Sequence, residues 1–217
     1  MTYLHINILF LCTFMLTACS SDMEQVSQAT DASESKSIEL GTDVKDVITT
    51  SPKVVDEKDV AVVTLKWDDL IPADFQPDKI LAKYQQEIDA TREGSKEERV
   101  LFAKVMAEFN SAGPNTNLNG KKVRIPGFVA PLDTDGENVV EFLLVPYYGS
   151  CIHSPPPPVN QTVMVSPRIG KSITLSQTNK PVWVVGELQA KEVDTDLAKA
   201  GYQIIDARVE GYIQPAY

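Results

Sequence analysis

A cysteine and a histidine lie two residues apart, directly before four consecutive prolines, in residues 149–161, which read GSCIHSPPPPVNQ. The prolines lack backbone N–H donors and have restricted φ angles, so this segment cannot be the middle of a helix or of a paired strand. Ser154 precedes a proline and therefore favours extended backbone. In extended backbone, residues i and i+2 point to the same side, so we expect Cys151 and His153 to share a face.

Three kinds of chemistry use a thiol and an imidazole this close together. Both are good ligands for Zn²⁺ or Cu⁺, so Cys151 and His153 are candidate metal ligands; Asp, Glu or a partner protein would have to complete the ligand set. Alternatively, His153 activates Cys151 as a nucleophile, although no third residue that would orient the imidazole is evident. In the third interpretation, both residues are structural or contact a partner protein.

The residues after His153 are expected to hold this site in place. Four prolines in the polyproline II conformation form a stiff ridge about 12 Å long without internal hydrogen bonds. Such a ridge would brace the cysteine and the histidine at the protein surface, and the polar residues behind it would shape the loop. We therefore assign a loop or binding role to Pro155, Pro156, Pro157, Pro158, Asn160 and Gln161.

The first 18 residues carry no charged side chain and contain an apolar stretch over residues 6–16. This stretch is shorter than the about 20 apolar residues that span a bilayer, so it indicates a signal peptide. It ends in LTAC at residues 16–19, which resembles the bacterial lipobox and implies cleavage before Cys19 and lipidation of its sulfur. Ser20 then points to the outer membrane. Cleavage leaves Cys151 and His153 as the only free thiol and the only imidazole.

The chain is acidic, with 30 Asp and Glu residues against 20 Lys and Arg residues and a net charge of −10. A polyanionic surface repels phosphate backbones and anionic lipid headgroups, so we expect no nucleic-acid partner. The acidity is compatible with attraction of cations, and equally with solubility alone.

The composition divides the mature chain into a linker and one domain. Residues 19–58 have few aliphatic and no aromatic side chains, so we expect a lipidated, flexible, acidic linker. Residues 59–217 have the length of a single globular domain. A helical period starts at Pro77, and Ser95 with Glu98 forms the pattern of a capping box, so we expect a helical hairpin over about residues 77–112. We interpret its apolar positions as a core face: Leu101, Phe102, Val105, Met106 and Phe109.

The period changes after Gly120, where five β-branched and aromatic runs are separated by Gly, Pro, Asn and Asp. Two of the runs contain an internal glycine, Gly127 and Gly186, at positions suited to bulges or sharp coiling. Five such strands after a helical hairpin predict an α+β protein with a small, curved, OB-like β-barrel. A β-sandwich is the alternative.

Four strings of residues resemble the DUF3299 family of uncharacterised bacterial secreted proteins and lipoproteins. They are WDDLIP at residues 67–72, GKKVRIPGFVAPL at 120–132, EFLLVPY at 141–147 and CIHSPPPPVNQ at 151–161. The resemblance covers about residues 67–213. It implies an accessory envelope protein, because genes of the family often lie beside genes for ABC transporter components, some of them in zinc-responsive operons. The resemblance implies no reaction.

We therefore expect an accessory metal-handling or binding protein of the cell envelope, with zinc or copper as the candidate metal. A lipid on Cys19 would hold it at the periplasmic face of a membrane, and ABC transporter components are the candidate partners. Two alternatives stay open: a thiol enzyme that uses Cys151 and His153, and a pure protein-interaction module. No residue is assigned a catalytic role.

Overall fold

The computed structural model describes residues 38–48 and 62–211 of the chain. The predicted signal peptide and the lipidation site Cys19 lie outside the described residues. Within the two described ranges, no helix is long and apolar enough to cross a membrane.

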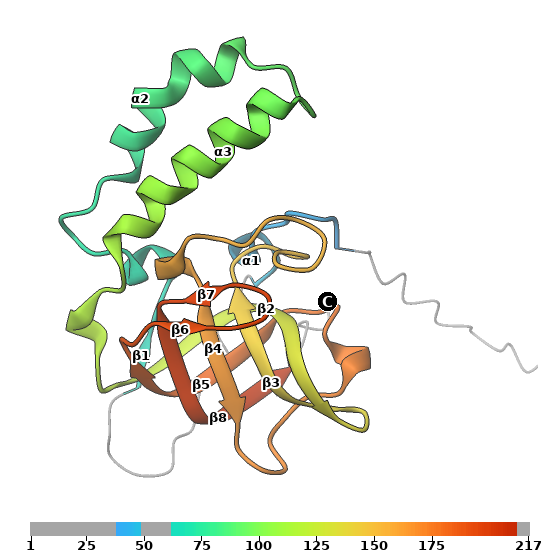
Figure 1. Cartoon of the computed structure of the whole chain (residues 1–217). Helices are drawn as coiled ribbons and strands as arrows, with labels where there is room; N and C mark the ends of the chain where they lie inside the picture. Colours follow the sequence, from blue (N-terminus) through green and yellow to red (C-terminus); the bar gives the residue numbers. More distant parts are fainter. Residues whose placement is uncertain (1–37, 49–61, 212–217) are drawn as a thin grey trace, which may run out of the picture. The chain divides into compact units, whose positions relative to one another are not determined.

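Five strands close into a mixed barrel, which confirms the predicted small, curved barrel of an α+β protein (Figure 1). The order around the barrel is β2-β3-β4-β8-β5, and β5 returns to pair with β2. All of these pairs are antiparallel except β4 with β8, which is parallel. The strands are β2 (Lys121–Asp135), β3 (Asn138–Val145), β4 (Val163–Pro167), β5 (Val182–Gln189) and β8 (Tyr202–Gly211).

Short elements surround the barrel strands. The two-residue strand β1 (Val63–Thr64) adds to the sheet beside β2, and β6 (Val193–Asp194) pairs with β7 (Lys199–Ala200) in a separate two-stranded sheet. The connections also contain single 3₁₀ turns: η1 (Trp67–Leu70), η2 (Asn110–Ala112), η3 (Thr116–Leu118), η4 (Val159–Gln161) and η5 (Leu175–Gln177).

The two glycines inside predicted strands both allow close packing in the barrel. Gly186 lies where the register between β5 and β8 shifts, and a Cβ there would come within 2.4 Å of Ile204 Cγ2. At Gly127, a Cβ would come within 2.7 Å of Leu144 Cγ. Neither position has room for a side chain, because the neighbouring groups belong to the buried core.

The predicted helical hairpin is confirmed as α2 (Pro77–Ala90) and α3 (Lys96–Phe109). Ser95 caps α3, since its Oγ accepts a hydrogen bond from Glu98 N at 3.0 Å. The Glu98 carboxylate accepts from the N–H of Gly94 and not from that of Ser95, so the capping box is displaced by one residue. The hairpin has its own small core of Tyr84, Leu101 and Val105.

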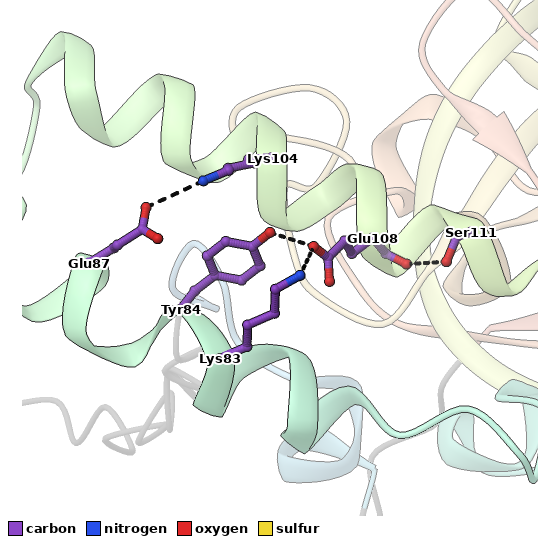
Figure 2. A network of polar contacts seen from close by, with 6 residues as sticks. All are labelled: Lys83, Tyr84, Glu87, Lys104, Glu108 and Ser111. Carbon is purple, nitrogen blue, oxygen red and sulfur yellow. Dashed lines mark hydrogen bonds and ion pairs between the residues drawn. The ribbon is translucent and has the colours of Figure 1, made fainter.

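A network of polar contacts joins the two helices on one side of the hairpin (Figure 2). The carboxylate of Glu108 accepts hydrogen bonds from the Tyr84 hydroxyl and the Lys83 ammonium group. A second ion pair joins Lys104 and Glu87 at 3.5 Å. Both lysines lie over the Tyr84 ring. These contacts tie α2 to α3 along a solvent-exposed edge.

The predicted core face of α3 is wrong at Phe102. Leu101 and Val105 are buried, but Phe102 is 45% exposed and Met106 is half-buried. The apolar arc of α3 is wider than the surface that one partner helix covers, since two crossing helices bury only a stripe of each other. Phe102 and Met106, which belong to this arc, instead line a groove beside the prolines.

The predicted linker is also too long, because residues 38–48 pack on the barrel. They contain the short helix α1 (Val44–Val47), and Val44 is only 1% exposed within the main core. The side chain of Asp43 caps this helix by accepting a hydrogen bond from Lys45 N. Ile38, Val47 and Ile48 also pack against this core, so several apolar side chains hold the segment on the barrel.

Candidate functional site

The loop of residues 149–158 is held at its upstream end by residues 41–44. Gly41 N donates to Tyr148 O at 2.8 Å, Tyr148 N donates to Thr42 O at 3.0 Å, and Val44 N donates to Pro146 O at 2.8 Å. These backbone bonds make residues 41–44 a short strand-like neighbour of the chain that enters the loop. Sequence reasoning missed this support, because the composition of residues 19–58 as a whole indicates a linker.

The segment around Cys151 and His153 is a tight turn, so the predicted extended backbone is wrong. The carbonyl of Gly149 accepts hydrogen bonds from the N–H groups of Ile152, His153 and Ser154, at 3.3, 2.8 and 3.2 Å. Cys151 N donates to Ser154 O at 3.0 Å, and Cys151 has a φ of +70°. A left-handed conformation is uncommon outside glycine, and surrounding contacts must maintain it. Cys151 and His153 therefore do not share a face through strand alternation.

The thiol and the imidazole have different surroundings. Cys151 is half-buried and packs against the main hydrophobic core, whereas His153 is exposed. The His153 ring lies next to Gly149, with Cδ2 3.6 Å from the place a Cβ would take. Burial raises the pKa of the Cys151 thiol to about 11. The thiol is therefore protonated at neutral pH, which is the opposite of what a cysteine nucleophile needs.

The metal hypothesis lacks a complete ligand set among the residues that the structure describes. Residues 38–48 and 62–211 contain no group of three or more His, Cys, Asp or Glu side chains placed to hold a metal ion. Cys151 and His153 supply at most two donors, and the thiol would first have to lose its proton. A four-coordinate Zn²⁺ at this loop would need further ligands from outside the described residues or from a partner.

The four prolines differ in exposure. Pro155 and Pro156 are exposed, Pro158 is half-buried and Pro157 is buried. Pro158 has φ −54° and ψ 155°, close to polyproline II values. The ridge thus presents its first two rings to solvent and packs its later part against the protein.

The downstream end of the loop is fixed by contacts to three separate parts of the chain. Val159 N donates to Asn110 Oδ1 at 2.9 Å, next to the end of α3. Gln161 Nε2 donates to the carbonyl of Trp67 at 2.9 Å. Gly201 N donates to Val159 O at 2.8 Å. The segment that follows the prolines is therefore a structural junction between the hairpin, η1 and the start of β8.

Asn160 and Gln161 lie inside this junction. Gln161 contributes the bond to Trp67, whose own indole N–H donates to Pro126 O at 2.8 Å. Asn160 is 2% exposed, and its Nδ2 has no hydrogen-bond partner within the described ranges. The geometry gives buried Asn160 and half-buried Gln161 a supporting position behind the exposed prolines.

Beside the prolines lies a groove that sequence reasoning missed. It is about 140 Å³ in volume and has walls from α3, from the prolines and from β7. Helical periodicity identified its α3 residues as apolar, but it could not show that they face the loop. The residues that line it are Phe102, Met106, Asn110, Pro156, Pro157, Val159, Ala198 and Lys199.

Comparison with known proteins gives one family and one structural relative. Residues 67–211 match the family model described as "Protein of unknown function (DUF3299)". The crystal structure of a DUF3299 family protein from Pseudomonas aeruginosa PAO1 is similar to this chain, with 30% sequence identity and a TM-score of 0.53. The match covers 72% of this chain and 99% of that one. No curated protein matches.

Proposed function

Since this chain belongs to the DUF3299 family, whose function its family model leaves open, we propose from the loop geometry that it is a binding protein of the cell envelope. In this proposal, residues 149–158 form the contact surface for a partner protein. The observation that carries it is a loop backbone held by hydrogen bonds at both ends, with exposed side chains at its tip. Ile152 is 50% exposed although the turn that holds it makes backbone bonds to Gly149.

Rigidity of the loop supports binding because it lowers the entropy that an interface would lose on association. The chain is fixed before the loop by residues 41–44 and after it by Asn110, Trp67 and Gly201. Between these points, an isoleucine, a histidine and two proline rings face solvent. Exposed apolar side chains on a fixed backbone are typical of interaction sites.

The thiol enzyme is the less favoured alternative. A catalytic cysteine needs a lowered pKa and a base within hydrogen-bond reach. Burial instead raises the pKa of Cys151 to about 11, and no hydrogen bond joins Cys151 to His153 in the described part of the chain. The apolar contacts of Cys151 with the core support a structural position for the thiol.

In this proposal, the protein binds a metal ion only when the partner protein is bound. Cys151 and His153 would be two ligands of Zn²⁺ or Cu⁺, and the bound protein would complete the site. An ABC transport component as the partner and a lipid anchor on Cys19 at the outer membrane are further parts of the proposal. The lipobox at residues 16–19 and the family resemblance support them.

Co-purification of the full-length lipoprotein from membranes tests the binding function. Ile152→Ser and Pro156→Ser change exposed side chains, so both variants should fold with an unchanged melting temperature. Ile169→Ser is the matched control, because Ile169 is fully exposed on the loop after β4. We expect one protein to copurify with the wild type and with the control, and its yield to fall at least tenfold in both loop variants. Equal recovery from all four proteins would contradict the proposal.

A further inference from the structure

We propose that the groove between α3 and the prolines binds one apolar side chain of a partner segment that also carries lysine or arginine residues. This inference rests on the proposed binding function, since the groove shares Pro156 with the exposed ridge. It adds the chemistry of the partner: an apolar anchor residue with basic neighbours.

The residues that line the groove determine which kind of partner side chain can bind in it. Six of its eight lining residues are apolar, from Phe102 on α3 to Ala198 before β7, and the prolines offer no N–H donor. The N–H of Val159 is already taken, because it donates to Asn110 Oδ1. A polar ligand would therefore find few free groups to replace its bonds to water, whereas an apolar group loses none.

The size of the groove favours a side chain over a free small molecule. Its volume of about 140 Å³ is well below the range of about 300–1,000 Å³ that is typical of small-molecule and cofactor sites. A single leucine, methionine or phenylalanine side chain is the kind of group that such a volume accommodates. Phe102 at 45% exposure leaves an aromatic face open to it.

The charged residues near the groove determine which residues should flank the anchor in the partner segment. Lys199 lines the groove, and the residues before it in the sequence include three exposed carboxylates: Glu192, Asp194 and Asp196. Lys199 itself is paired with two of them, at 3.6 Å and 3.4 Å, so it balances one of these three negative charges.

The η1 turn adds to this acidic surface. It contacts η4 and exposes the carboxylates of Asp68 and Asp69, next to the exposed Lys66. In residues 191–199 and 66–70 together, five carboxylates stand against three lysines, and the whole chain likewise has an acidic excess, with a net charge of −10. A segment with positive charges on both sides of its anchor is complementary to this surface.

Fluorescence anisotropy with three labelled synthetic peptides tests the inference on the detergent-solubilised full-length protein. The probe KKSFSKK has the anchor and the charges, KKSASKK lacks the anchor, and EESFSEE reverses the charges. We expect KKSFSKK to bind at least tenfold more tightly than either of the other two, because the anchor loses water-exposed apolar surface and the flanks gain charge complementarity.

Two variants of α3 separate the groove from general charge attraction. Phe102→Ser should remove the difference between KKSFSKK and KKSASKK. Val100→Ser is the matched control and should keep it, since Val100 is exposed on the same helix but lies about 160° away around its axis and does not line the groove. Equal binding of the first two peptides, no binding of any peptide, or the same loss in both variants would overturn the inference. In the co-purification experiment, the partner could be lost from Ile152→Ser but still recovered with Phe102→Ser. This result would support the proposed binding function and show that the groove is not part of the binding surface.

Discussion

Cys151 shows how a single backbone angle changes the interpretation of a motif. From the sequence, a Cys-x-His pattern before prolines suggested extended backbone with two side chains on one face. The structure has a left-handed Cys151 with a φ of +70°, inside a turn that Gly149 and Ser154 close. The sequence does not indicate a left-handed conformation at position 151, because cysteine rarely adopts one. The thiol consequently contacts the core, while His153 stays exposed.

The thiol of Cys151 should react slowly with alkylating reagents at neutral pH. Burial raises its pKa to about 11, so only about one thiol in ten thousand is ionised at pH 7. We expect the rate of iodoacetamide labelling to rise about tenfold per pH unit between pH 7 and pH 10. Mass spectrometry measures the rate, with Cys151→Ser as the unlabelled control. A rate that is already constant from pH 6 upward would show an activated thiol and revive the enzyme alternative.

The isolated protein should bind zinc only weakly. Complete structural zinc sites bind with apparent free energies of about 10–16 kcal/mol, and they use four ligands, of which Cys151 and His153 could supply two. We expect calorimetric titration of the metal-free full-length protein to give no such tight one-to-one site, and little change in Cys151→Ser or His153→Ala. Tight binding that both substitutions weaken at least tenfold would instead establish a metal site in this chain alone.

At the scale of elements, the helical hairpin and the five barrel strands were predictable from periodicity. The apolar period of 3.6 residues and the Ser95 cap mark α3, and β-branched runs between Gly and Pro mark the strands. The sequence could not reveal the groove, because a helical period does not say which other element covers each apolar side chain. It also did not reveal that residues 38–48 pack on the barrel, because their apolar side chains lie between polar stretches whose composition indicates a linker.

The junction behind the prolines predicts a specific effect of a substitution at Gly201. A Cβ at this position would lie 2.6 Å from the backbone oxygen of Val159, and the backbone of η4 cannot rotate away as a side chain could. Gly201→Ala should therefore destabilise the protein by about 1–3 kcal/mol in urea unfolding, as overpacking typically does. Gly211→Ala is the matched control, since a Cβ there meets nothing within 4 Å. An unchanged free energy of unfolding for Gly201→Ala would contradict the tight contact between β8 and η4.

For the whole molecule, the hairpin and the barrel have separate cores, so they need not lose stability together. The polar network of Figure 2 joins α2 to α3 and extends to Ser111 in η2, without a barrel residue among those drawn. The Lys83 ammonium group and the Tyr84 hydroxyl hold the pKa of Glu108 below its ordinary value. A lowered pKa means that this contribution is fully present above the ordinary pKa and is lost as the pH falls through the lowered one.

Hydrogen exchange at several pH values should detect this difference between the two parts. As the pH falls below about 4.5, the ordinary pKa of a glutamate, we expect protection factors of α3 amides to fall more than those of barrel amides. Glu108→Gln should lower the α3 protection at neutral pH and reduce its dependence on pH. Glu97→Gln changes an exposed glutamate at the other end of the same helix, outside the network of Figure 2, and should leave the protection of the last turns of α3 nearly unchanged. Equal behaviour of the two variants would show that the network does not stabilise the hairpin.

Site-specific photo-crosslinking in living cells tests the binding surface most directly. A photoreactive residue is placed at position 152 or 156 on the loop, or at position 169 as the exposed control on another loop. We expect one and the same crosslinked partner from positions 152 and 156, and none from position 169. Absence of a specific product from both loop positions, or equal products from all three, would contradict a partner-binding role for residues 149–158.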